Sequence, residues 1–238
     1  MNQTIIFYQL FELESSTYTY LLADPATKEA VIIDSVLETV ERDLKLIREL
    51  GVDLKYILDT HVHADHITGA GRLRALTGAK SAISHQAKVE CVDHPLKDGD
   101  KLFIGNTAIS AFETPGHTNS CMSFLIENRI FTGDALLIRG TGRTDFQGGS
   151  SETLFDSVHQ KIFALPDHTE VYPGHDYNGH TKSTISLERQ FNPRLGQGKS
   201  KSEFVKIMSE LKLANPKKIQ QALPANLTCG IVAEKQSL

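Results

Sequence analysis

The chain has 238 residues, of which 40% are hydrophobic and 23% are charged, a composition typical of a folded globular protein. The formal net charge of −4 excludes a protein that binds nucleic acid or a membrane surface through a general excess of basic residues. No apolar run approaches the roughly 20 residues of a membrane-spanning helix, and the first residues do not resemble a signal peptide. We therefore expect a cytoplasmic protein, or one of the mitochondrial matrix if a longer eukaryotic precursor is processed.

The first sixty residues predict short strands and one helix. Apolar, β-rich runs predict strands at residues 5–11, 17–22, 30–33 and 54–58. The turn-like residues 24–27 join the second and third strands into an antiparallel hairpin. Residues 40–50 have apolar side chains at helical spacing, and Gly51 follows as a stop signal.

The rest of the chain continues this alternation. Further strands are predicted at residues 82–84, 101–103, 108–113, 122–127, 129–132 and 170–172. Further helices are predicted at residues 69–76, 152–164, 181–190 and 201–211. Many strands with a few interspersed helices predict a layered α/β domain that is built on mixed sheets.

The three cysteines do not form a recognisable motif. Cys91, Cys121 and Cys229 lie far apart in the sequence, are odd in number and form no CxxC pair. We expect each to be a small buried thiol. A structural disulfide is not expected, and its absence would suit a reducing compartment.

Four polar segments each follow a predicted strand, where a rigid scaffold presents functional side chains. They are THVHADH (60–66), PGH (115–117), TGD (132–134) and PGHD (173–176). In the first, His61 and His63 share a face while the chain is extended, and His63 and His66 share a face if it turns helical. Neutral imidazoles and the carboxylate of Asp65 are ligands that suit Zn, Fe and Mn. The segment therefore predicts a metal site.

The other three segments each place a glycine directly before a metal-capable residue. These residues are His117, Asp134 and His175. Glycine permits a tight turn, which lets the next side chain point back into a cleft. Asp59 lies at the end of the strand predicted at 54–58, directly before the segment 60–66. It could orient a ligand histidine or could stabilise the turn there by an Asx contact. The residues alone do not separate a site for one metal from a site for two.

The pattern THxHxDH with a downstream His, Asp and His resembles the metallo-β-lactamase superfamily. This resemblance implies an αββα sandwich of two mixed sheets flanked by helices, with the metal at one edge. Because the superfamily includes hydrolases such as glyoxalase II as well as redox enzymes, the fold does not decide the reaction. Over nearly the whole chain, THVHADHITGAGRLR, PGHTNSCMSF, FTGDALLIRGTGRTDFQGG, VYPGHDYNGHTKST and NPRL look like persulfide dioxygenase. GRTDFQ, HDY and NPRL are the discriminating pieces.

The resemblance implies one Fe(II) per chain, bound by His61, His117 and Asp134. Two histidines and one carboxylate form a facial triad, which leaves three coordination positions for O2, substrate and water. The remaining groups would support these ligands through hydrogen bonds. They are His63, Asp65, His66 and His175. In a dinuclear hydrolase of the same fold, the corresponding positions bind metals.

The implied reaction is the oxidation of glutathione persulfide by O2 to sulfite and glutathione, a step of sulfide detoxification. Arg143 and Arg194 could bind the carboxylates of this tripeptide, and Tyr177 could add a hydroxyl contact. Arg143 could instead be structural and pair with Asp145.

The alternative activity is a glutathione thioester hydrolase of the glyoxalase II type with two metals. A third interpretation is a sulfur-responsive binding module that has lost catalysis. All candidate metal ligands are present, so the sequence does not support such a loss. We expect residues 1–238 to form one domain, with 181–238 as a family-specific C-terminal part and no rhodanese-like domain. A sulfurtransferase partner would then be a separate chain, and a homodimer is left open.

Overall fold

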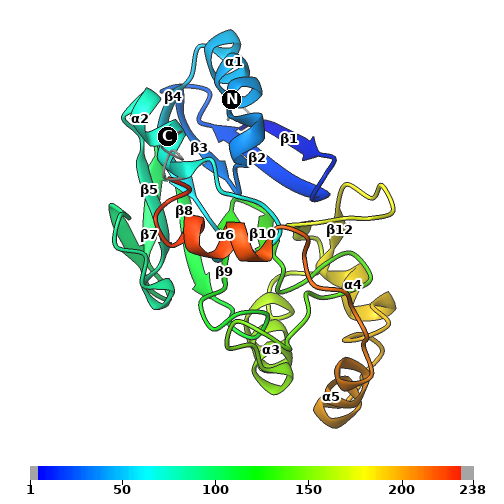
Figure 1. Cartoon of the computed structure of the whole chain (residues 1–238). Helices are drawn as coiled ribbons and strands as arrows, with labels where there is room; N and C mark the ends of the chain where they lie inside the picture. The colour runs from blue at the N-terminus through cyan, green and yellow to red at the C-terminus, as the bar shows by residue number, and fades with distance from the viewer. Residues whose placement is uncertain (1–4, 232–238) are drawn as a thin grey trace, which may run out of the picture.

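Two mixed β-sheets pack face to face in the computed structural model, which describes residues 5–231 (Figure 1). The first sheet has the strand order β1-β2-β3-β4-β5-β6. Its strands are β1 (Ile6–Glu12), β2 (Thr17–Ala23), β3 (Glu29–Ile33), β4 (Asp53–Leu58), β5 (Lys80–Ser84) and β6 (His94–Leu96). The first three strands are antiparallel neighbours, whereas β3 to β6 run parallel.

The second sheet has the strand order β12-β11-β10-β9-β8-β7. Its strands are β7 (Lys101–Ile104), β8 (Thr107–Glu113), β9 (Met122–Ile126), β10 (Arg129–Gly133), β11 (Glu170–Pro173) and β12 (Ser183–Thr184). Only β10 and β11 pair in parallel. The two sheets therefore both mix parallel and antiparallel pairs, as the sequence predicts.

Helices cover the outer faces of both sheets (Figure 1). The first sheet carries η1 (Leu37–Thr39), α1 (Val40–Leu50), α2 (Ala70–Thr77) and η2 (His85–Ala87) in its connections. The second sheet carries α3 (Ser151–Ser157) and η3 (Val158–Ile162) between β10 and β11, and it is followed by α4 (Ile185–Phe191), α5 (Lys201–Ser209) and α6 (Ile219–Asn226). Among residues 5–231, no helix has the length and the apolar character needed to cross a lipid bilayer. The predicted αββα sandwich is confirmed.

Side-chain alternation along the strands builds a core on each face of each sheet. In β2, Tyr20 and Leu22 point into the core between the sheets, while Leu21 and Ala23 point outward to α1 and α2. Successive side chains of a strand point to opposite faces, so a strand that is covered on both sides is buried along its whole length and is largely apolar. All seven residues of β2 are buried.

Some element predictions need correction. The helix predicted at 152–164 is α3 followed by the π-helical turn η3, and the helix predicted at 181–190 begins only at Ile185, after β12. Besides β12 and the short helices η1 and η2, the strand β6 and the helix α6 were not predicted. Both contain a proline, Pro95 in β6 and Pro224 in α6, and proline weakens the sequence signal of either element.

The prediction that no structural disulfide forms is wrong. Cys91 and Cys229 form a disulfide with a Cα–Cα distance of 6.1 Å, although 138 positions separate them. The pairing could not be read from the spacing, because it depends on the C-terminal chain returning to the loop that precedes β6. Cys121 is a buried thiol, as expected.

A hydrogen bond across the core links the two sheets close to the edge where the polar segments lie. The buried hydroxyl of Tyr20 donates to the backbone oxygen of Pro173 at 2.6 Å, at the end of β11. The ring of Tyr20 also packs against Phe131 and Tyr172, with centroid distances of 4.9 Å and 5.6 Å. This contact fixes the end of β11 relative to β2.

We predict that Tyr20→Phe lowers the free energy of unfolding by about 1–3 kcal/mol, because the buried oxygen of Pro173 loses its donor. Urea denaturation followed by circular dichroism measures this change. Tyr8→Phe is the matched control, since Tyr8 is 38% exposed and should change stability by less than about 0.5 kcal/mol. Equal effects of the two substitutions would contradict the proposed role of the cross-sheet hydrogen bond.

Candidate metal centre

The four predicted segments meet at one edge of the sandwich. Three of them follow the ends of β4, β10 and β11, and the fourth lies in the loop between β8 and β9. Backbone hydrogen bonds join them: Met122 N donates to Thr60 O at 2.7 Å, and Gly174 N donates to Gly133 O at 2.8 Å. The loops therefore support one another directly.

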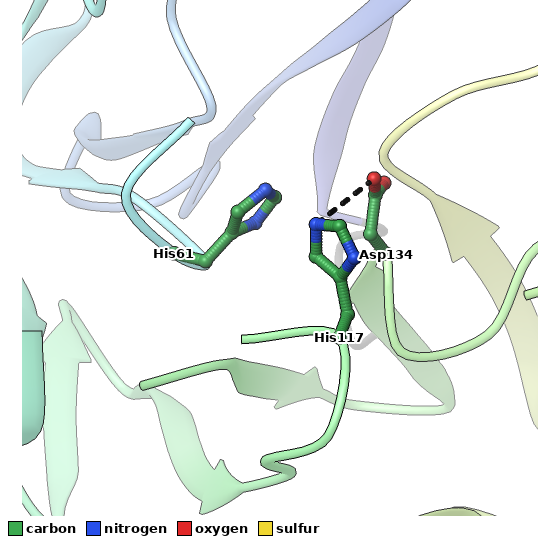
Figure 2. Close-up of side chains that lie close together, drawn as sticks. All are labelled: His61, His117 and Asp134. Carbon is green, nitrogen blue, oxygen red and sulfur yellow. Dashed lines mark ion pairs between the residues drawn. The ribbon is translucent and has the colours of Figure 1, made fainter. Parts of the chain in front are cut away.

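His61, His117 and Asp134 come together at this edge. Each offers one ligand atom, and these three atoms lie within 4.8 Å of one another. Figure 2 shows the two imidazoles and the carboxylate gathered from three separate loops, with His117 Nε2 3.6 Å from Asp134 Oδ2. Both histidines are buried, with 2% and 6% of their surface exposed. The structure thus groups the three residues that the sequence resemblance assigns to one metal.

Hydrogen bonds fix which nitrogen of each histidine is free. His117 Nδ1 donates to the backbone oxygen of Arg143 at 2.6 Å, which leaves Nε2 with its lone pair. His61 Nδ1 lies 3.0 Å from the hydroxyl of Thr60, which itself donates to Asp34 Oδ2 at 3.0 Å. Since the proton of that hydroxyl is donated to Asp34, the hydroxyl oxygen accepts from His61 Nδ1, and Nε2 of His61 again keeps its lone pair.

The charge state of His61 also suits a metal ligand. Burial holds the pKa of His61 well below its usual range, and the neighbouring His63 and His117 lower it further. A neutral imidazole is the form that binds a metal ion.

Glycine is required where β10 ends. Gly133 has a φ of +49°, and a Cβ at this position would lie 2.4 Å from Thr60 Oγ1. The turn therefore brings Asp134 close to the segment that carries His61. The glycine signal that the sequence showed before Asp134 corresponds to this close approach.

A second group forms beside the first. His63, Asp65 and His66 also offer ligand atoms within 4.8 Å of one another. His63 Nε2 donates to Asp34 Oδ1 at 3.1 Å, and Asp65 Oδ2 lies 3.0 Å from His66 Nδ1. Burial alone would lower the pKa of His63, but the Asp34 carboxylate outweighs it and raises the pKa to about 9.

His175 connects the two groups. Its Nε2 lies 3.6 Å from both Asp65 Oδ2 and Asp134 Oδ1, and its Nδ1 donates to the backbone oxygen of Ser16 at 3.2 Å. Burial lowers the pKa of His175, but the carboxylates of Asp134 and Asp65 outweigh it and raise the value. All seven predicted metal-capable residues therefore lie in one cluster.

The donor set fits a divalent transition metal. Asp134 Oδ1 and His66 Nε2 are buried without a hydrogen-bond partner in the part of the chain that the structure describes. Buried polar atoms are normally satisfied, so unpaired ones within a cluster of ligand residues fit a site that binds a cation. Two imidazoles and a carboxylate at His61, His117 and Asp134 match the ligands of iron, zinc and manganese.

A cleft of about 550 Å³ opens from this cluster. Arg143, Tyr177 and Arg194, the predicted substrate-binding residues, all line it. Arg194 is largely buried and donates from Nη1 to the backbone oxygen of Thr141 at 2.8 Å. It forms no ion pair with any residue between 5 and 231, and burial lowers its pKa.

Arg143 is occupied by other groups of the chain. Its Nε and Nη2 donate to the two carboxylate oxygens of Asp145 at 2.5 Å and 2.6 Å, and its Nη1 donates to Ala214 O at 2.7 Å. The structure thus shows the pairing that the sequence left as its alternative role. Tyr177 is 72% exposed, and its ring is stacked on His175 with a centroid distance of 6.0 Å.

Three contributors to the site were missed or left open by sequence reasoning. Asp34 follows β3 and binds both Thr60 and His63; its position at the end of an apolar strand is the same signal that identified the other segments. Asp59 accepts from the hydroxyl of Thr68 at 3.0 Å. Asn226 binds the backbone of the loop after β4, and no local pattern announces it.

Comparison with known proteins agrees with this geometry. Residues 14–175 match the model of the metallo-beta-lactamase superfamily. The persulfide dioxygenase ETHE1 of Bos taurus, a mitochondrial protein, is 51% identical over 95% of this chain and 89% of its own length. The crystal structure of ETHE1 from Myxococcus xanthus superposes with a TM-score of 0.93 at 50% identity, covering 95% of this chain and 100% of that one.

A more distant relative is named as a glyoxylase. Glyoxylase B2 of Dictyostelium discoideum is 33% identical over 94% of this chain and 91% of its own length. The higher identity of the ETHE1 proteins favours an oxidoreductase over a hydrolase. The chain belongs to the persulfide dioxygenase family of the metallo-β-lactamase superfamily.

Proposed function

We propose that this chain oxidises glutathione persulfide with O2 to sulfite and glutathione at one Fe(II), which His61, His117 and Asp134 would hold. The observation that carries the proposal is the convergence of two histidine nitrogens and one carboxylate oxygen in a cleft, in a chain 51% identical to a persulfide dioxygenase. The outer sulfur loses four electrons, which O2 accepts, and water supplies the third oxygen of sulfite. The S–S bond breaks, and the glutathione thiolate takes up a proton.

When bound, Fe(II) would supply a centre at which O2 and the substrate sulfur are brought together and activated. The protein's contribution is to present the ligands in a fixed orientation. Asp34 orients His61 through Thr60, and the backbone of Arg143 orients His117. His175 steadies the carboxylate of Asp134 from the opposite side.

In this proposal the site holds one metal, because the four other metal-capable residues (His63, Asp65, His66 and His175) form hydrogen bonds or ion pairs within the protein. His63 is bound to Asp34, and Asp65 is shared between His66 and His175. One observation favours the rival dinuclear hydrolase, because His63 Nδ1 and His66 Nε2 have no hydrogen-bond partner within residues 5–231. The metal content of the protein separates the two functions.

Arg194 is the residue best placed to recognise the substrate. Its partly buried guanidinium has free donors in the cleft and no carboxylate partner among residues 5–231. A glutathione carboxylate would supply that partner through bidentate hydrogen bonds. Arg143 stays a predicted substrate contact, although its guanidinium is already bound to Asp145, and Tyr177 would cover the cleft from the loop after β11.

We place the reaction in the cytoplasm, or in the mitochondrial matrix for a processed eukaryotic chain, which the name of the bovine relative supports. A separate sulfurtransferase would supply the persulfide to this chain, whose residues 1–238 we propose to act as one catalytic domain. A homodimer is compatible with this proposal and is not required by it.

We predict that protein reconstituted with Fe(II) without oxygen binds about one iron per chain and consumes O2 when glutathione persulfide is added, because a facial triad holds one ion. Elemental analysis and an oxygen electrode make the two measurements. Asp134→Ala should abolish both, while Glu49→Ala, at an exposed position of α1, should change neither. Two metals per chain with thioester hydrolysis and no O2 uptake would contradict the proposal.

Replacement of Arg194 should weaken substrate binding. We predict that Arg194→Met raises KM for glutathione persulfide about 10- to 100-fold with a smaller change in kcat, because a charge-assisted hydrogen bond contributes about 1.5–3 kcal/mol. Steady-state oxygen consumption measures both constants. Arg189→Met is the control, because Arg189 pairs with Asp167 on the surface. An unchanged KM for Arg194→Met would exclude its proposed role.

The hydroxyl of Thr60 should control metal affinity through His61. We predict that Thr60→Val weakens Fe(II) binding about 10- to 100-fold, as loss of a hydrogen-bond partner of a metal ligand commonly does. Anaerobic competition with a coloured iron chelator gives the affinity. Thr60→Ser keeps the hydroxyl and should retain wild-type affinity. If the valine variant binds Fe(II) as tightly as the serine variant, the hydrogen bonds from Asp34 through Thr60 to His61 do not control the affinity.

A further inference from the structure

The C-terminal segment around α6 holds the loop that follows β4. The buried side chain of Asn226, the last residue of α6, donates from Nδ2 to His63 O at 2.8 Å and to His66 O at 2.9 Å. Its Oδ1 accepts from Thr68 N at 2.9 Å. One side chain thus satisfies three backbone groups of residues 63–68, so it fixes the conformation of the loop between His61 and α2.

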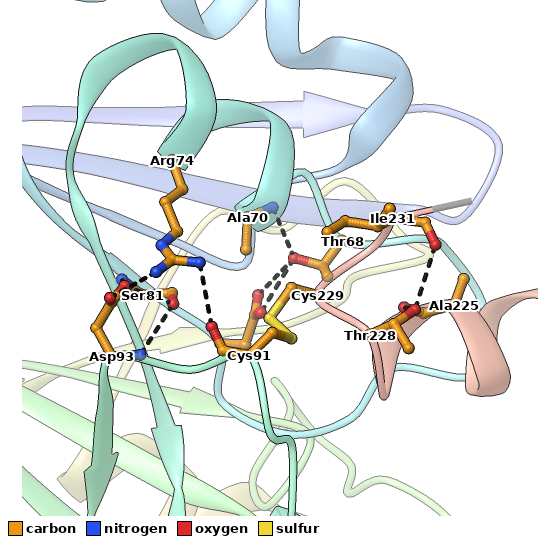
Figure 3. Close-up of a disulfide and its surroundings, with 11 residues drawn as sticks. Thr68, Ala70, Arg74, Ser81, Cys91, Asp93, Ala225, Thr228, Cys229 and Ile231 are labelled. Carbon is orange, nitrogen blue, oxygen red and sulfur yellow. Dashed lines mark hydrogen bonds and ion pairs between the residues drawn. A yellow bond between two sulfur atoms is a disulfide. The ribbon is translucent and has the colours of Figure 1, made fainter. Parts of the chain in front are cut away.

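The disulfide attaches this segment covalently to the first sheet. Figure 3 shows Cys229, three residues after Asn226, joined to Cys91 in the loop before β6. Around it, Cys229 O accepts from Gly71 N at 2.9 Å, and Gly230 packs so closely that a Cβ there would lie 2.0 Å from Thr68 O. The disulfide therefore lies directly beside the end of the loop that Asn226 binds.

Without the disulfide, the segment is held by non-covalent contacts alone, among them the hydrogen bonds of Asn226 and of Cys229 O. The helix α6 has eight residues and contains Pro224, and so short a helix is not stable by itself. Its described non-covalent contacts include packing of Leu223 near Val62, and ion pairs of Lys218 that lie at the other end of the helix. The bond between Cys229 and Cys91 is the covalent attachment of the end of α6 that carries Asn226, and it keeps that end beside the backbone groups that Asn226 binds.

We propose that Asn226 is a positioning residue for the metal-binding loop and that the Cys91–Cys229 disulfide makes this positioning depend on the redox state. Reduction would release the end of α6, loosen residues 63–68 and weaken retention of the metal. Re-oxidation would restore the contact. A disulfide in a reducing compartment is more often a redox-responsive element than a permanent structural bond.

The reductant would be a small thiol. Cys91 is partly exposed, whereas Cys229 is 4% exposed, so a thiolate reaches the sulfur of Cys91 first. The attack forms a mixed disulfide at Cys91 and releases Cys229 as a thiolate, which takes up a proton. A second thiol then attacks the mixed disulfide and releases Cys91. Two thiols are thereby oxidised to one disulfide, and the protein gains two electrons and two protons.

The test compares the oxidised protein with the same protein treated with a phosphine reductant. Alkylation of the denatured protein, read by mass spectrometry, should label one cysteine before reduction and all three after it. Fe(II) transfer from the loaded protein to a coloured chelator should be about ten-fold faster after reduction, the size of effect expected for loss of support to a metal site. Hydrogen exchange should increase in residues 61–68 and not in β8 and β9.

Variants distinguish redox-dependent positioning of the metal-binding loop from a general loss of protein stability. Cys91→Ser should behave like the reduced protein and should not respond to the reductant. Asn226→Ala should release Fe(II) rapidly in both redox states, while Gln221→Ala, at an exposed position of α6, should behave like the wild type. None of these readouts needs turnover, so their result is independent of the proposed dioxygenase activity.

Three results would overturn the proposal. The first is that three free thiols remain after mild oxidation. The second is that chelator transfer and hydrogen exchange are the same before and after reduction of the wild-type protein. The third is that Asn226→Ala retains the metal as well as Gln221→Ala does. Because the first two use the wild-type chain, they stay decisive even if a variant does not fold.

Discussion

The buried carboxylate of Asp34 is the contact on which the metal-binding edge depends. It lies directly after β3 and is 1% exposed, yet it accepts hydrogen bonds from the backbone and hydroxyl of Thr60 and from His63. A buried charge is tolerated only when such bonds satisfy it. Its position therefore constrains both the start of the loop after β4 and the tautomer of His61. The parallel pairing of β3 with β4 brings these groups into register.

The core between the sheets, the loops at the strand ends and the residue Arg143 each contribute to the position of the metal-capable residues. The core between the sheets aligns the strand ends. Backbone hydrogen bonds join the loop after β10 to the loop after β11, and the loop after β4 to the start of β9. Arg143 joins these parts to the last quarter of the chain: its backbone holds His117, and its guanidinium holds Ala214 at the wall of the cleft. The ligands and the wall are thereby coupled through one residue.

Much of this arrangement could be predicted from the sequence. Strands were recognised by their alternating or fully apolar patterns. The polar segments that follow these strands were identified as the candidate site. Both predictions depend only on residues that are close in the sequence. The cluster of His61, His117 and Asp134 followed from the same signals and from the family resemblance. The roles of the individual residues stay predictions, since the geometry groups seven candidates and does not by itself assign a metal.

What the sequence could not show depends on contacts between distant segments. The disulfide of Cys91 with Cys229 and the binding of Asn226 to the loop after β4 both require the chain to return after more than a hundred residues. The sequence left two roles open for the guanidinium of Arg143, a contact with the substrate or an ion pair with Asp145. Two positions of separation allow that ion pair but do not require it. Proline obscured β6 and α6, whose stability comes from tertiary packing.

The division of the cleft between two parts of the chain has a consequence for how such enzymes diversify. Every metal-capable residue of the cluster lies within residues 14–175, the part that matches the superfamily model, whereas Arg194 and the 213–218 wall lie beyond it. The metal-capable cluster is thus encoded in the first stretch, whereas the wall of the cleft is shared between that stretch, which holds Arg143, and the later one, which holds Arg194. Exchange or drift of the later stretch could redirect the same centre to a new thiol without disturbing the ligands, so acceptance of new substrates could evolve separately from the chemistry.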